Sequence, residues 1–110
     1  MSVSVHVVNG AYGRPVVGMS ARIDSRVDGA WVEQIRAETD EKGNLPGCPA
    51  WPLTRGVYQI ELDLDRYFSS LGITPFYPSV AIRFRISDPS YEHHISLLVT
   101  PSSYLTYRQD

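Results

Sequence analysis

The chain has 110 residues, of which 43% are hydrophobic and 20% are charged, and its formal net charge is −2. This length and composition are typical of one globular domain, which we expect to span residues 1–110. The small negative charge and the lack of a basic stripe argue against nucleic-acid binding, and no apolar run is long enough to span a membrane.

Most of the chain alternates between apolar and polar residues, which predicts β-strands. The predicted strands, in chain order, cover residues 3–8, 19–24, 31–38, 58–64, 80–86, 95–100 and 103–108. Turn-forming sequences separate them, and these are Asn9-Gly10, Tyr12-Gly13-Arg14-Pro15, Asp28-Gly29, Lys42-Gly43-Asn44 and Ser87-Asp88-Pro89. Because the chain starts directly with a strand pattern, we expect no signal peptide and a cytoplasmic location.

One segment has the features of a helix. It starts at Asp65, a residue type that caps helices, and stops at Gly72, with Phe68 and Leu71 spaced three apart. This pattern predicts a single short helix over about residues 65–71. Many short strands with one helix predict an all-β fold, an antiparallel β-sandwich.

The alternation also predicts where two histidines point. His6 lies on the face opposite Val5 and its apolar neighbours, which we expect to fill the core. His94 shares a strand face with Ser96. If the two strands belong to one sheet, both imidazoles lie on its outer face, where they could act as a general acid and base near neutral pH. By the same parity His93 faces the core, which is typical of a partly buried, hydrogen-bonded histidine.

Other chemistry receives less support. His6, Glu92 and His94 could in principle ligate a metal, but their spacing matches no zinc signature, so we expect neither a metal nor a cofactor. Cys48 is the only cysteine, which excludes an internal disulfide and indicates an incidental or structural thiol.

Several segments spread over nearly the whole chain carry family signatures. They are Ser4–Asn9 with Gly13–Pro15, Thr39–Gly43, Tyr67–Phe68, Leu71–Pro78, His94–Pro101 and Tyr104–Arg108. In these segments, and in their spacing, the chain resembles the transthyretins and 5-hydroxyisourate hydrolases.

The resemblance implies a transthyretin-like (prealbumin-like) sandwich of two four-stranded sheets with one short helix. It also implies a homotetramer, built as a dimer of dimers, with small-molecule sites in the channel between dimers. The wall of that channel comes from the first and the last two long strands. The enzymes of the family hydrolyse a lactam bond in an oxidation product of urate, which belongs to purine metabolism.

The resemblance also implies roles for particular residues. His6 matches the N-terminal histidine of the enzymes, where transthyretin proper has a lysine, and His94 matches the second histidine of their His-Tyr-His motif. We therefore predict His6 and His94 as the catalytic residues. The predicted substrate-binding residues on the same channel wall are Asn44, Ser96, Leu105, Tyr107, Arg108 and Asp110.

Several of these positions depart from the family pattern. Asn44 stands where the family has a catalytic arginine, which would hold a planar anion with paired, charged donors. Ser96 replaces a proline, and Leu105 replaces a serine and makes the wall more apolar. Glu92 and His93 replace the first two residues of His-Tyr-His, and Gln109-Asp110 replaces the terminal Gly-Ser.

Three functions remain open from the sequence. The first is hydrolysis of 5-hydroxyisourate or a close cyclic amide, which the two histidines support and Asn44 opposes. The second is a ring-opening or ring-forming step on a more apolar substrate in specialised metabolism, which the changed positions support. The third is non-catalytic binding of a small molecule, which His6 weighs against.

Overall fold

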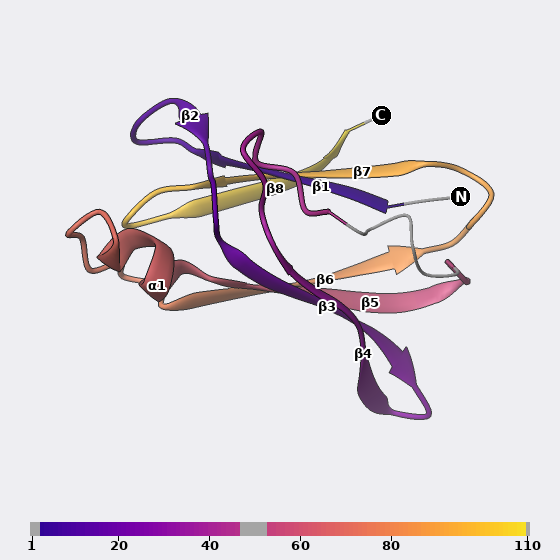
Figure 1. Cartoon of the computed structure of the whole chain (residues 1–110). Coiled ribbons are helices and arrows are strands. Elements are labelled where there is room, and N and C mark those ends of the chain that lie inside the picture. Colours follow the sequence, from indigo (N-terminus) through magenta and orange to yellow (C-terminus); the bar gives the residue numbers. More distant parts are fainter. Residues whose placement is uncertain (1–2, 47–52, 110) are drawn as a thin grey trace.

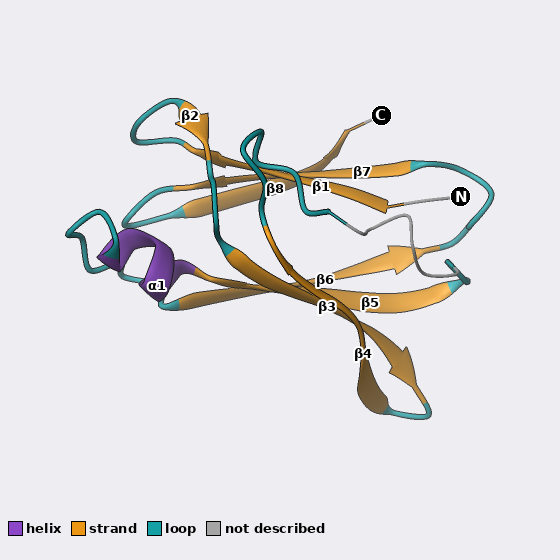
Figure 2. Ribbon diagram, viewed as in Figure 1, coloured by secondary structure: helices purple, strands orange, loops and turns teal. Residues whose placement is uncertain are grey.

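The chain folds into two four-stranded β-sheets that stack face to face, with one short helix at one end of the sandwich (Figures 1 and 2). The computed structural model describes residues 3–46 and 53–109. The predicted all-β fold with two four-stranded sheets and one helix is therefore confirmed. The predictions for Cys48 and Asp110 fall outside the described residues.

The first sheet contains the N-terminal strand and the two C-terminal strands. Its order is β2 (Arg14–Pro15), β1 (Val3–Asn9), β7 (His93–Val99) and β8 (Tyr104–Gln109). β1 pairs with β7 in parallel, and the other two pairings are antiparallel. β1 and β7 are therefore the central strands of this sheet, each hydrogen-bonded on both sides.

The second sheet is antiparallel throughout. Its order is β4 (Ala30–Glu38), β3 (Ser20–Val27), β5 (Gly56–Asp63) and β6 (Ser79–Ile86). The register between β3 and β4 shifts at Ile23 and Asp24, where a bulge interrupts the pairing. β4 is largely exposed, so β3 and β5 supply most of this sheet's contribution to the core.

The core lies between the sheets and follows the alternation of the strands. β1 reads buried and half-buried in strict succession, with the even-numbered residues outward. The buried apolar side chains with the largest volumes come from both sheets and the helix, and include Phe68, Met19, Ile23, Ile60, Leu62, Leu64, Ile86 and Leu97. Because the inner face of the first sheet is fixed by this packing, its outer face is fixed as well.

The helix starts one residue before the predicted segment and ends two residues earlier. α1 spans Leu64–Ser69, and its N-cap is Asp63, whose carboxylate accepts a hydrogen bond from the backbone N–H of Arg66. The predicted cap, Asp65, lies instead in the first turn, where an acidic side chain favours the helix dipole. The reason is burial: Leu64 and Phe68 form the i, i+4 pair that packs into the core.

A short strand also lies where a turn was predicted. Arg14–Pro15 forms β2, which pairs with Val8 and Asn9 of β1. The prediction was wrong because a two-residue strand has no alternation to detect. Asn9 holds this corner: its buried side chain accepts hydrogen bonds from the N–H groups of Ala11 and Tyr12 and donates to the hydroxyl of Tyr67.

Candidate active site

The structure places the two predicted catalytic histidines on neighbouring strands and on the same face. In the parallel pairing of β1 with β7, His6 lies beside Ser96 and Ser4 lies beside His94. The residues on either side of His6 are buried, as is Ile95 next to His94, so both imidazoles face away from the core. The predicted convergence on one outer face therefore has its structural basis in adjacent strands.

A tight turn brings Asn44 next to His6. The carboxylate of Asp40 accepts hydrogen bonds from the backbone N–H groups of Lys42 (2.9 Å) and Asn44 (3.0 Å). Asn44 then forms an isolated antiparallel bridge with His6. This turn is docked on β1 by two further backbone bonds, from Val7 N to Gly43 O (2.8 Å) and from Leu45 N to the carbonyl of Val5 (3.0 Å).

Gly43 makes this close approach possible. Its backbone has φ +83°, a region that favours glycine. A Cβ at this position would lie 2.5 Å from the carbonyl oxygen of Val7 and 3.4 Å from the Cδ2 atom of His6. The turn therefore sits directly against the strand that carries His6.

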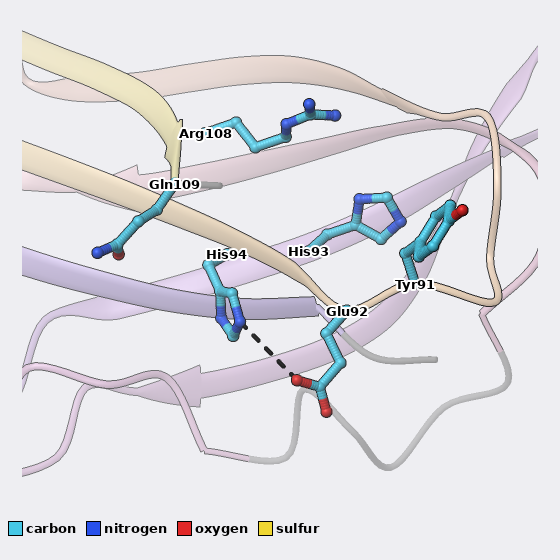
Figure 3. Close-up of a pocket in the computed structure, with 6 residues that line it drawn as sticks. All are labelled: Tyr91, Glu92, His93, His94, Arg108 and Gln109. Carbon is cyan, nitrogen blue, oxygen red and sulfur yellow. Dashed lines mark ion pairs between the residues drawn. The ribbon is translucent and has the colours of Figure 1, made fainter.

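Each imidazole has polar partners. His6 Nε2 lies 2.9 Å from the carbonyl oxygen of Lys42, and because a carbonyl only accepts, Nε2 carries the proton in this bond. His94 Nδ1 is hydrogen-bonded to the hydroxyl of Ser4. On its other side, His94 Nε2 lies 3.9 Å from a carboxylate oxygen of Glu92 (Figure 3).

Both histidines line an open groove of about 440 Å³ on the outer face of the first sheet. Its lining contains four of the predicted site residues, His6, His94, Asn44 and Ser96. The remaining lining residues are Ser4, Lys42, Ile95 and Gln109. The groove is mostly polar, and its volume is within the range of small-molecule sites.

The sequence prediction did not include Ser4, Lys42 or Gln109. Ser4 was recognisable, because it has the same strand parity as His6. Gln109 pairs with His94 across β7 and β8, which depends on the register of two strands. Lys42 enters the groove only through the docking of the turn, for which the sequence carries no periodic signal.

The last strand divides its predicted site residues between two faces. Tyr107 pairs with Ser96 and Leu105 pairs with Leu98, so both share the outer face with the histidines. They are 55% and 57% exposed. They do not line the groove itself, and extend the same face toward the edge of the sheet.

Arg108 has the opposite parity, because it pairs with the core residue Ile95. It lines a neighbouring cavity of about 400 Å³ together with Tyr91, Glu92 and His93, and with His94 and Gln109, which also line the groove. Figure 3 shows Gln109 on the same side of the strands as His94, with Arg108 and His93 on the other side. The structure thus brings Arg108 close to the groove without making it part of the lining.

The loop before β7 is tied to the strand that carries His94. His93 is half-buried, and its Nε2 donates to the carbonyl oxygen of Asp88 (2.9 Å). This is the hydrogen-bonded environment expected for it. The hydroxyl of Ser90, and then its backbone N–H, donate to the Asp88 carboxylate and lower the pKa of that carboxyl.

The described residues contain no group of three or more His, Cys, Asp or Glu side chains arranged to hold a metal ion. In the same part of the chain, no helix is long and apolar enough to cross a membrane. The described side chains that line the groove carry imidazole, hydroxyl, amide and ammonium groups, besides the apolar side chain of Ile95.

Comparisons with known proteins agree with the resemblance in the sequence. The model of the HIUase/Transthyretin family matches residues 3–109. The 5-hydroxyisourate hydrolase of Mus musculus is 34% identical over 110 residues, covering 96% of this chain and 92% of the mouse protein. The 5-hydroxyisourate hydrolase of Salmonella dublin is 28% identical over 108 residues, covering 96% of this chain and 78% of that protein.

Two solved structures have the same architecture. The crystal structure of (S)-allantoin synthase superposes with a TM-score of 0.91 at 28% identity over 99% of this chain, which spans only 43% of the synthase chain. The structure of Klebsiella pneumoniae 5-hydroxyisourate hydrolase gives a TM-score of 0.86 at 23% identity and is covered completely. The family match, the relatives and the fold agree, and the chain belongs to the HIUase/Transthyretin family.

Proposed function

We propose that this protein is an enzyme that hydrolyses 5-hydroxyisourate, or a closely related cyclic amide, by general acid–base catalysis with His6 and His94. The observation that carries the proposal is the meeting of both imidazoles on one face of two adjacent strands, at a groove of small-molecule size. The relatives named 5-hydroxyisourate hydrolase, at 28% to 34% identity over nearly the whole chain, support the substrate class.

His6 has the arrangement of a general base. Its Nε2–H donates to the carbonyl of Lys42, which leaves the Nδ1 lone pair of the neutral ring to accept a proton from water. The Lys42 carbonyl therefore fixes both the tautomer and the orientation of the ring. This is the role that a hydrogen-bonded partner plays for a catalytic histidine.

His94 has the arrangement of a general acid. A protonated ring can donate from Nδ1 to the Ser4 hydroxyl while Nε2–H faces the carboxylate of Glu92. His94 can then deliver a proton to the nitrogen that leaves when the amide bond breaks.

The reaction balances with these two groups and one water molecule. His6 takes a proton from water as the oxygen attacks the amide carbonyl carbon. The C–N bond then breaks, the nitrogen takes a proton from His94, and the carbon becomes a carboxyl group. The side-chain amide of Asn44 lines the groove beside His6, where its N–H could donate to the carbonyl oxygen as negative charge develops there.

The test is the ultraviolet decay of freshly generated 5-hydroxyisourate with the wild type, His6→Ala and His94→Ala. We expect the wild type to accelerate the decay and each substitution to reduce the rate by about 10²- to 10⁴-fold. Decay at the uncatalysed rate with the wild type would refute the proposal. An equal rate in all three proteins would leave the histidines without a catalytic role and favour another mechanism.

A second candidate function has a specific observation in its favour. Leu105 and Tyr107 expose more than half of their surface on the face that carries the histidines, so the surroundings of the groove are partly apolar. This favours a larger, less polar ring than 5-hydroxyisourate, opened or formed by the same imidazoles. The likeness to (S)-allantoin synthase also supports variation of the reaction on this fold. Saturable inhibition of 5-hydroxyisourate hydrolysis by apolar cyclic amides would distinguish this candidate from an enzyme specific for 5-hydroxyisourate.

The third function, non-catalytic binding, makes a different prediction: both histidine variants would still bind the small molecule.

We also propose that the protein works as a homotetramer, a dimer of dimers in the cytoplasm, with the groove at the contact between dimers. The exposed Leu105 and Tyr107 support this, because a monomer would leave both in water beside the site. Light scattering tests the assembly, and a monomeric mass at micromolar concentration would refute it.

A further inference from the structure

The lining of the groove includes a lysine whose ammonium group the acid–base chemistry does not use. Among the described residues that line it, Lys42 is the only ionisable one apart from the two histidines. It is also the only lysine of the whole chain. The other lining residues are neutral hydroxyls, amides and one apolar side chain. From the described lining residues, a ligand in this groove therefore meets one lysine and no carboxylate.

The position of Lys42 is set by its backbone. Its N–H donates to the carboxylate of Asp40, and its carbonyl accepts from His6. The next residue, Gly43, is bonded to Val7 of β1. The root of the lysine side chain is thus held against the strand that carries the proposed base. Only the flexible side chain beyond it has to order when a ligand binds, which limits the entropic cost.

The ammonium group of Lys42 is not neutralised by a neighbour in the described part of the chain. The ion pairs there involve Arg22, Arg36, Arg66 and His94 as the cationic partners. The turn also carries two carboxylates: that of Asp40 is engaged by two backbone N–H groups, and that of Glu41, the residue before Lys42, takes no part in these ion pairs. Lys42 is exposed and free to pair with a ligand.

We propose that Lys42 is the specificity-determining residue of the groove, and that it selects a planar cyclic amide carrying a negative charge. This inference rests on the proposed function for the identity of the reaction. The preference of the groove for an anionic ligand is argued from Lys42 alone. An ammonium group acts as a point charge, so it tolerates anions of different shape better than a guanidinium does. It would also hold the carboxylate that hydrolysis creates.

Side-chain substitution separates this charge from the architecture. Lys42→Met removes the ammonium group but retains the backbone carbonyl that orients His6, and Lys42→Arg retains the charge. Arg66→Met is the matched control, because it removes one positive charge from an exposed residue of α1, outside the groove lining. The probes are urate, a planar anion at neutral pH that has the substrate's ring size, and caffeine, an uncharged purine.

Calorimetric titration of the full-length chain should give about tenfold weaker urate binding for Lys42→Met than for the wild type, since a charged hydrogen bond is lost. Binding by Lys42→Arg and Arg66→Met should stay within about twofold of the wild type, and caffeine should not distinguish the four proteins. Added salt should weaken urate binding by the wild type more than by Lys42→Met. In the decay assay, Lys42→Met should raise KM for 5-hydroxyisourate more than it lowers kcat.

The possible failures are distinguishable. Equal urate binding by the wild type and Lys42→Met, or no urate binding by either, would overturn the inference about Lys42 whether or not the wild type hydrolyses 5-hydroxyisourate. Lys42-dependent urate binding without any acceleration of the decay would uphold the inference and refute only the proposed reaction.

Discussion

The substitution Gly43→Ala tests the docking of the turn on β1, on which the whole groove depends. An alanine at φ +83° pays about 1–2 kcal/mol for a left-handed backbone. Its Cβ would also lie 2.5 Å from the carbonyl oxygen of Val7, so the turn or the strand must move. Movement would weaken the backbone bonds to Val7 and Val5, at about 1 kcal/mol each. We therefore expect the free energy of unfolding to fall by about 2–4 kcal/mol.

Gly18→Ala is the matched control for this prediction. Gly18 has nearly the same backbone angle, φ +78°, but a Cβ there would have nothing within 4 Å. It should cost only the backbone term, about 1–2 kcal/mol. Urea unfolding with linear extrapolation measures both variants. If Gly43→Ala is no more destabilising than Gly18→Ala, the close contact with β1 is not what holds the turn.

Three further predictions concern the site and its surroundings. Ser4→Ala should lower the rate of 5-hydroxyisourate decay by about tenfold with little change in stability, because His94 loses the partner that orients its ring. An unchanged kcat would contradict an orienting role for Ser4. Asn44→Arg should lower KM for 5-hydroxyisourate by about tenfold in the decay assay, since a guanidinium beside His6 adds charged donors. A raised KM would instead favour the second candidate function, with a less polar substrate. Ser90→Ala removes the main cause of the lowered pKa of Asp88. A carboxyl whose pKa is lowered in the folded state stabilises the fold at pH values above the ordinary pKa of aspartate, and this stabilisation is lost as the pH falls through the folded-state pKa. Urea unfolding should therefore find the variant less stable than the wild type at pH 7, with a smaller difference in acid.

Strand parity was enough to predict which way each histidine points. In β1 the valines occupy alternate positions, and hydrophobic burial of one face leaves His6 on the other. The same reasoning applies to His94 next to Ile95. These are local consequences of a period of two, and they do not depend on which strands are neighbours.

The features that the sequence did not predict are those that depend on contacts between distant segments. Lys42 reaches the groove because the turn docks on β1, and nothing in the local pattern of the turn indicates this. A different error concerns Tyr107 and Arg108, which were both predicted to bind substrate because both belong to a family motif, although adjacent residues of a strand face opposite ways. Strand parity already separates the two residues, and the register with β7 shows that Tyr107 is the one on the face of the histidines.

The distribution of these residues over the fold explains how such a site could change its substrate and retain its chemistry. His6 and His94 lie on the two central strands of their sheet, whose inner faces are packed into the core. Any shift of these strands would disturb that packing, so the proposed acid–base pair is fixed by the same interactions that stabilise the fold. Lys42 and Asn44 lie on an exposed turn, and Leu105 and Tyr107 lie on the edge strand β8. Side chains at these positions can change with little effect on the core. On the proposed function, the reaction type is therefore tied to the fold, while the charge and polarity of the substrate depend on residues that the fold leaves free to vary.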